Sequence, residues 1–189
     1  MGGHGPFALI GRFLPTRRSA LKALHWGIIP FFIWFLFADP DALRRMGPRY
    51  FQFHSMMGLI FVTLALIWTG WTLRAGLQSR PGPKLRGAAR ALHRPLHLTL
   101  VWGLFAVALG GFLLGVTASF QMMAGGIVPI GVPLNKPQAH DLIGVAHTYQ
   151  FYALAGIAAF HTAFYVRRHV KLRDNALRIM APKMFHRYL

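Results

Sequence analysis

Three features of the sequence predict an all-α integral membrane protein, folded as a four-helix up-down bundle. The chain is apolar: of 189 residues, 54% are hydrophobic and 13% are charged. Its apolar residues gather in four stretches near the length of about 20 residues that crosses a bilayer. Its basic residues concentrate outside these stretches. Because lipid offers the backbone no hydrogen-bond partner, apolar stretches of this length should be helical.

The predicted spans cover residues 23–37, 50–73, 96–119 and 142–166. The first is the shortest, and Pro30 interrupts it. No small-residue cleavage site follows it, so we expect a retained helix. The connections are short to moderate, so successive helices should pack antiparallel in one domain over residues 1–189. Small residues in the spans permit close helix approach or leave space for a flat cofactor: Gly58, Gly103, Gly110, Gly111, Gly115, Gly144 and Gly156.

The net charge of +17 would suit nucleic-acid binding, but its distribution indicates membrane topology instead. Basic residues dominate the N-terminal segment, the connection after the second span and the C-terminal tail, whereas the other two connections also contain Asp39, Asp41 and Asp141. By the positive-inside rule, both termini should face the cytoplasm. The basic excess then contacts anionic lipid, and no nucleic-acid partner is expected.

The chain contains no cysteine. This excludes disulfides, thiolate metal sites, iron–sulfur clusters and covalent haem attachment through a Cys-x-x-Cys-His motif. Any haem must therefore be held non-covalently.

Four histidines lie in the apolar spans at matched depths. His147 and His161 are fourteen residues apart in the last span, which places them about 21 Å apart along the helix and about 40° apart around it. The topology pairs His25 with His161 near the cytoplasmic face and His54 with His147 near the outer face. Imidazoles are costly in lipid unless they are used, and facing side chains in a bundle core build cofactor sites.

The two pairs predict two haems b, each with two histidine axial ligands. Bis-histidine ligation saturates the iron and favours electron transfer over oxygen binding. The alternatives are interfacial placement of single histidines, or metal binding by the same residues in a transporter.

His93 and His97 form a different pair, four residues apart at the start of the third span. Together with His169 they are candidate contacts for a quinone or a haem propionate. A zinc site on the i, i+4 pair is the second interpretation, but the chain contains no glutamate to complete it. The third is ordinary interfacial placement.

Several short elements carry a family resemblance. They are Ala-Leu-His25-Trp26 in the first span, Phe-His54 with Gly58 in the second, Leu92-His93 and His97 in the third, His147 and His161 in the fourth, and the tail from Arg173-Asp174-Asn175 to Pro182. On these elements the chain resembles the bacterial cytochrome b561 family, which is similar to the b-type subunits of nickel–iron hydrogenases and formate dehydrogenases. The resemblance covers most of residues 19–182.

The resemblance implies a multi-pass protein of the bacterial inner membrane, with haem ligands at His25, His54, His147 and His161, that exchanges electrons with ubiquinone. In one branch, superoxide oxidase, electrons come from periplasmic superoxide, and the short chain and its tail favour this activity. The alternative is a membrane anchor and electron conduit for a periplasmic dehydrogenase or hydrogenase. The apolar connection 121–137, which lies in the outer interface or folds back over the bundle, would then be the docking surface. Many relatives have glutamate after the first fourth-span histidine, where this chain has Thr148.

Overall fold

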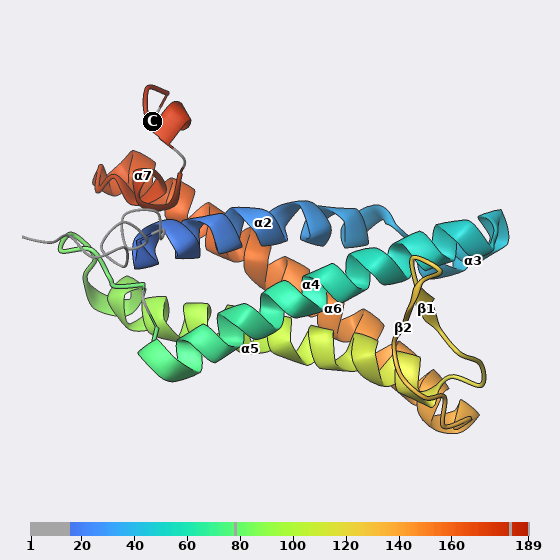
Figure 1. The fold of residues 1–189 in the computed structure, drawn as a ribbon. Helices are drawn as coiled ribbons and strands as arrows, with labels where there is room; N and C mark the ends of the chain where they lie inside the picture. The colour runs from blue at the N-terminus through green and yellow to red at the C-terminus, as the bar shows by residue number, and fades with distance from the viewer. Residues whose placement is uncertain (1–15, 78, 182, 189) are drawn as a thin grey trace, which may run out of the picture.

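Four long helices form the molecule in the computed structural model, which describes residues 16–77, 79–181 and 183–188 (Figure 1). They are α2 (Arg17–Phe37), α4 (Pro48–Ala75), α5 (Gly87–Thr117) and α6 (Pro137–Arg167). Each contains a segment long and apolar enough to cross a membrane. The predicted all-α membrane bundle is confirmed.

The helices begin earlier than the apolar stretches that predicted them, because their first turns are polar. α5 begins at Gly87 and α6 at Pro137. Proline opens α3, α4 and α6 at a position where its missing N–H is not needed. The Asp39 carboxylate accepts a hydrogen bond of 2.6 Å from Ala42 N at the start of α3 (Pro40–Met46), which stabilises an exposed helix start.

The two ends of the bundle differ in character. At the end that we call the basic end, α2 begins, the α4–α5 connection turns and α6 finishes near α7 (Ala176–Met180) (Figure 1). At the hairpin end lie α3 and two short antiparallel strands, β1 (Met123–Ala124) and β2 (Val128–Pro129). Gly125 N donates to Gln52 O at 2.9 Å, so this connection folds back onto the start of α4.

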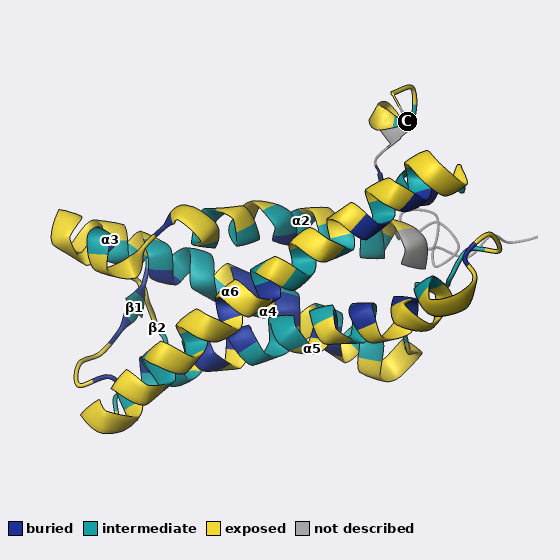
Figure 2. Cartoon of the chain, turned by 180° about the vertical axis from the view of Figure 1, so that it is seen from behind, coloured by how far each residue is buried: buried dark blue, intermediate teal, exposed yellow. Residues whose placement is uncertain are grey.

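The contact between α5 and α6 depends on glycines of α5. A Cβ atom on Gly103 would lie 2.8 Å from Leu154 Cδ1, closer than packed carbon atoms approach. Small residues at such positions let two membrane helices come close. Side chains of all four helices meet beside this contact in one buried cluster with Ile28, Phe61 and Phe151. Figure 2 shows buried residues on the inward faces and exposed ones outside.

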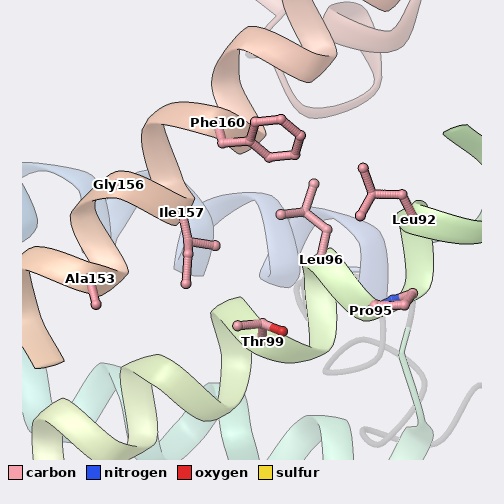
Figure 3. A pocket seen from close by; sticks show the side chains of 8 residues that line it. All are labelled: Leu92, Pro95, Leu96, Thr99, Ala153, Gly156, Ile157 and Phe160. Atoms are coloured by element: carbon pink, nitrogen blue, oxygen red, sulfur yellow. The ribbon is translucent and has the colours of Figure 1, made fainter.

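An apolar groove runs along an exposed side of the α5–α6 contact (Figure 3). Its volume is about 380 Å³. Side chains of Leu92, Leu96 and Thr99 from α5 face those of Ile157 and Phe160 from α6.

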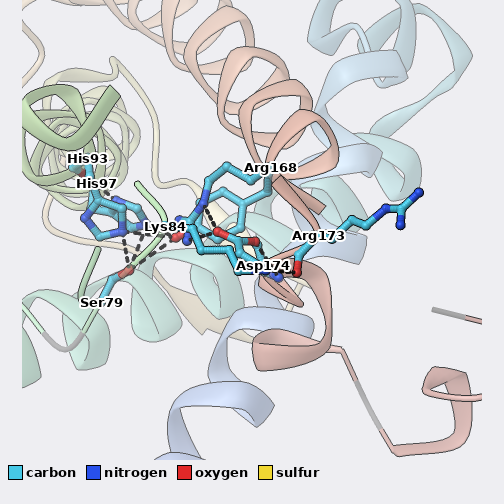
Figure 4. A network of polar contacts seen from close by, with 9 residues as sticks. Ser79, Lys84, His93, His97, Arg168, Arg173 and Asp174 are labelled. Atoms are coloured by element: carbon cyan, nitrogen blue, oxygen red, sulfur yellow. Dashed lines mark hydrogen bonds and ion pairs between the residues drawn. The ribbon is translucent and has the colours of Figure 1, made fainter. Parts of the chain in front are cut away.

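A buried ion pair holds the basic end together. Arg168 donates to Asp174 Oδ2 from Nε at 2.9 Å and from Nη2 at 2.7 Å, and both side chains are almost fully buried (Figure 4). Asp174 Oδ1 accepts from Ala176 N at 3.0 Å and so caps α7. A Cβ atom on Gly82 would lie 2.9 Å from Arg168 Nη2, so the α4–α5 connection packs directly on the pair.

The chain must bend sharply to bring Asp174 under Arg168. A π-helical turn, Arg168–Leu172, continues α6, and Arg173 and Asn175 then adopt positive φ angles of 46° and 56°. Asparagine tolerates this conformation better than most residues. The end of α7 lies against α2, where Trp26 Nε1 donates to Met180 O at 2.8 Å.

We expect Asp174→Asn to destabilise the protein by about 3–5 kcal/mol, because it leaves the Arg168 charge buried without a partner. The amide retains an oxygen for Ala176 N, so the helix cap survives. Thermal unfolding of the detergent-solubilised protein measures the effect. Asp41→Asn is the control, since Asp41 pairs with Arg44 at 3.5 Å on the surface, where such a pair contributes less than about 1 kcal/mol. Equal losses of unfolding free energy in the two variants would contradict the role of the buried ion pair.

Candidate functional site

His54 and His147 lie at one level of the bundle, toward the hairpin end. Their imidazoles lie within electrostatic range of each other, one from α4 and one from α6. Phe35 contacts His54 edge-on with ring centroids 5.0 Å apart, and Phe51 stacks on it at 6.3 Å. His54 Nδ1 is buried and has no hydrogen-bond partner among the described residues.

Two glycines of α5 make room for His147. A Cβ atom on Gly110 would lie 2.7 Å from His147 Nδ1, and one on Gly111 would lie 3.5 Å from Cε1. Any other residue at Gly110 would displace the ring. The imidazole therefore lies flat against the α5 backbone, in a position determined by the absence of a side chain.

His25 and His161 lie at the second level, toward the basic end. His161 lies within electrostatic range of His25, across the bundle from α6 to α2. Trp68 contacts His25 with centroids 5.8 Å apart. His97 contacts His161 edge-on at 5.0 Å, and His161 Nδ1 is buried without a hydrogen-bond partner among the described residues.

An aromatic layer separates the two histidine levels. Phe61 lies two turns beyond His54 on α4, and Phe151 lies one turn beyond His147 on α6. Phe35 contacts both, at centroid distances of 5.6 and 6.3 Å. These rings fill the middle of the bundle and exclude water between the levels.

His93 and His97 join a polar cluster beside His161 (Figure 4). Ser79 Oγ lies 3.2 Å from His93 Nε2 and 3.1 Å from His97 Nε2. Tyr165 Oη lies 3.3 and 3.1 Å from the same two nitrogens. His93 is 1% exposed, so the cluster is closed on that side.

The cluster fixes the tautomer of His97. Its Nδ1 lies 2.6 Å from the His93 carbonyl oxygen, which can only accept. Nδ1 therefore carries the proton, and in the neutral ring Nε2 accepts from the hydroxyl of Ser79 or Tyr165. Because both hydroxyls also lie within hydrogen-bond distance of His93 Nε2, the two hydroxyls and the two imidazoles form one connected network.

His169 is not part of this cluster. It lies in the π-helical turn, and no hydrogen bond or ring contact within the described part of the chain joins it to His93 or His97. Its Nδ1 is buried without a hydrogen-bond partner there, like Trp71 Nε1 and His93 Nδ1. The basic end therefore holds three buried nitrogens that can bond to a ligand.

The zinc interpretation gains no support. Within residues 16–77, 79–181 and 183–188, no group of three or more His, Cys, Asp or Glu side chains could hold a metal ion. His93 and His97 instead satisfy each other through Ser79, Tyr165 and the backbone.

Sequence reasoning missed three residues that organise the basic end: Ser79, Tyr165 and Asp174. Tyr165 follows His161 by four residues, so helical spacing places both on one face. Asp174 is the one acid among many bases of the tail, which is a signal for a specific ion pair. Ser79 lies in a Gly/Pro/Arg-rich connection, and no local pattern distinguishes it.

Thr148 follows His147 on α6, at the position where the family resemblance leads us to expect a glutamate. Its hydroxyl donates to Gly144 O at 3.0 Å, within its own helix, and the residue is exposed. It therefore adds no polar group to the space between His54 and His147.

The fold and the core histidines define a class: helical membrane proteins that build cofactor sites between their helices. A family model described as prokaryotic cytochrome b561 matches residues 17–183. No curated protein sequence matches the chain. The chain belongs to the prokaryotic cytochrome b561 family and is a membrane b-type cytochrome of electron transfer.

The core residues fit a b-type haem, which the family binds. Histidine is a common axial ligand of non-covalent haem iron. Each level contributes a buried imidazole whose Nδ1 has no partner in the described protein, on His54 and on His161. The surrounding rings and the glycine-lined face of α5 provide apolar, flat surfaces.

We expect Gly110→Ala to lower the amount of b-type haem bound per chain, because the added methyl group displaces the His147 ring. Haem quantified against protein, with the reduced-minus-oxidised spectrum, measures this. Gly70→Ala is the matched control, since a Cβ atom there meets nothing within 4 Å. Both changes favour the helix by a similar amount, so equal haem content in the two variants would contradict the placement of His147.

Proposed function

We propose that this cytochrome holds two haems b, one between His25 and His161 and one between His54 and His147, and passes electrons across the membrane to a quinone. The observation that carries the proposal is that a histidine of α6 lies within electrostatic range of a histidine on another helix at each of two levels, His147 with His54 of α4 and His161 with His25 of α2. Bound haem would supply one-electron redox chemistry.

The chain's own residues would set the conditions for that chemistry. Phe35, Phe61 and Phe151 exclude water between the levels. Gly110 and Gly111 leave the space that the His147 ring occupies against α5. A dry and preformed site lowers the reorganisation that accompanies a change of charge.

Quinone reduction consumes two protons for two electrons, and we assign their delivery to the basic end. Ser79 and Tyr165 hydroxyls bond to His97 Nε2 beside His161, and such groups act as proton donors and acceptors. The buried nitrogens of Trp71, His93 and His169 are candidate donors to a quinone carbonyl or a haem propionate. With both termini in the cytoplasm, these protons come from the cytoplasmic side.

The specific activity that we favour is superoxide oxidase, a superoxide:ubiquinone oxidoreductase of the bacterial inner membrane. Two superoxide anions would be oxidised to two dioxygen molecules at the hairpin end, and one ubiquinone would take up two electrons and two protons at the basic end. The support is the resemblance of its tail, from Arg173 to Pro182, to the ending of the small stand-alone members of the family.

One observation favours a second function, that of an electron conduit for a periplasmic dehydrogenase or hydrogenase. The hairpin connection exposes large apolar side chains at its surface: Ile127 is 76% exposed and Val132 is 77% exposed. Exposed apolar surface often marks a docking site. In this case the cytochrome would receive electrons from a protein partner.

The pairing predicts which variants behave alike. His25→Ala and His161→Ala should each lose one and the same haem, and His54→Ala and His147→Ala should each lose the other, because a haem with one ligand binds weakly. The amount of haem per chain, together with a redox titration of the purified protein, shows which of the two haems each variant has lost. His140→Ala is the control, since His140 contacts Thr117 outside both pairs. A double variant, His25→Ala with His147→Ala, that kept a bis-histidine haem would contradict the pairing.

The identity of the electron donor is tested with protein purified in detergent and supplied with ubiquinone. Superoxide generated in the sample should reduce the haem and then the quinone, and superoxide dismutase should abolish both. Absence of haem reduction by superoxide would contradict the oxidase activity. Co-purification with a periplasmic redox protein, and reduction only in its presence, would instead establish the conduit.

A further inference from the structure

A second pocket lies at the basic end, between the α4–α5 connection and the end of α6. Its volume is about 340 Å³. Five cationic side chains and no carboxylate line it: Lys84, Arg86, Arg167, Arg168 and Lys171. Its floor is apolar, formed by Leu85, which is 1% exposed, and Phe164, which is 8% exposed.

The cations in this pocket are largely uncompensated. Only Arg168 has an acidic partner among the lining residues, and Asp174 engages its Nε and Nη2, which leaves Nη1 outside the pair. Lys84 Nζ donates to a neutral carbonyl, Arg173 O, at 3.0 Å. Several positive charges held around one cavity favour an anion with several acceptor oxygens.

The apolar groove of Figure 3 begins where this pocket ends. On α5 the pocket reaches Ala89 and the groove starts at Leu92, and on α6 they meet between Phe164 and Phe160. Leu85, Leu96 and Phe164 pack in one buried cluster, which forms a shared wall. From Leu92 to Thr99 the groove extends about 10 Å along α5, and at Gly156 it is open, with nothing within 4 Å of an added Cβ atom.

We propose that the pocket and the groove together bind one anionic phospholipid, with the phosphate among the cations and an acyl chain along the α5–α6 groove. A basic pocket between membrane helices on the side of the anionic leaflet recognises such head groups. A free phosphate would leave the groove unused. A quinone would bring neutral carbonyls to a cavity with four unpaired cations. The proposal depends on the membrane fold and not on the electron donor or acceptor.

The bound lipid would join two segments that already pack together where Gly82 lies against the Arg168–Asp174 pair. Lys84 and Arg86 belong to the α4–α5 connection, and Arg167 and Lys171 to the end of α6. Arg168 lies over the Tyr165 ring at 4.9 Å, so the lipid site shares a wall with the polar cluster. Lipid occupancy therefore stabilises the end of the molecule that holds Ser79, His93 and His97.

The test uses the full-length haem-loaded protein in an uncharged detergent. Phosphatidylglycerol should raise the unfolding temperature and remain bound in native mass spectrometry, whereas phosphatidylcholine with the same chains should do neither. Replacing Arg86, Arg167 and Lys171 with glutamine should weaken phosphatidylglycerol binding by roughly a hundredfold, if each contributes as a cation near an anionic membrane does. Arg74, Arg90 and Arg94, which are exposed and outside the pocket, replaced in the same way, form the charge-matched control.

Gly156→Leu tests the acyl chain separately, because it fills the groove without touching the cations. It should weaken phosphatidylglycerol binding and leave the binding of inorganic phosphate unchanged. An equal loss of phosphatidylglycerol binding in the charge-matched control would overturn the proposal, because it would indicate general attraction of the lipid to a basic surface. The proposal would also be overturned if inorganic phosphate alone raised the unfolding temperature as much as phosphatidylglycerol does, or if ubiquinone displaced the lipid.

Discussion

The close approach of α5 and α6 is the contact on which the rest of the molecule depends. It exists because Gly103 and Gly110 carry no side chain: a methyl group at either would lie within 3 Å of an α6 side chain. In a bilayer, lipid chains are as apolar as leucine, so two helices gain little from burying apolar surface and must gain from close packing instead. Here the gain in packing also determines where the histidines of α6 lie.

The consequences extend to both levels of the core. His147 rests on the backbone of α5, which keeps it opposite His54. Fourteen residues further on, His161 lies beside His97. The Arg168–Asp174 pair then secures the last turn of α6 against the α4–α5 connection. The core that contains the four histidines is thus held by helix packing toward the hairpin end and by a buried ion pair at the basic end.

The sequence was sufficient to predict the helices and the histidine pairs as candidates, because both depend on regular spacing. Hydropathy marks the spans, and the interval between His147 and His161 follows directly from helix geometry. The hairpin could not be predicted, since its strands have two residues each and are held by a bond to Gln52, seventy residues earlier. Ser79 reaches His97 through a connection without periodicity, and only the folded chain brings them together.

The position of α6 as the last of the four long helices has a consequence for biosynthesis. Both histidine levels take one member from α6, and the C-terminal segment fastens to α2 through Trp26. A nascent chain with only α2, α4 and α5 in the membrane therefore lacks His147 and His161, one histidine of each proposed pair. Under the proposed pairing, haem capture must await the insertion of α6, and a fragment truncated before α6 would contain His25 and His54 without His161 and His147. Such fragments would be distinguishable from the finished protein by their lack of colour.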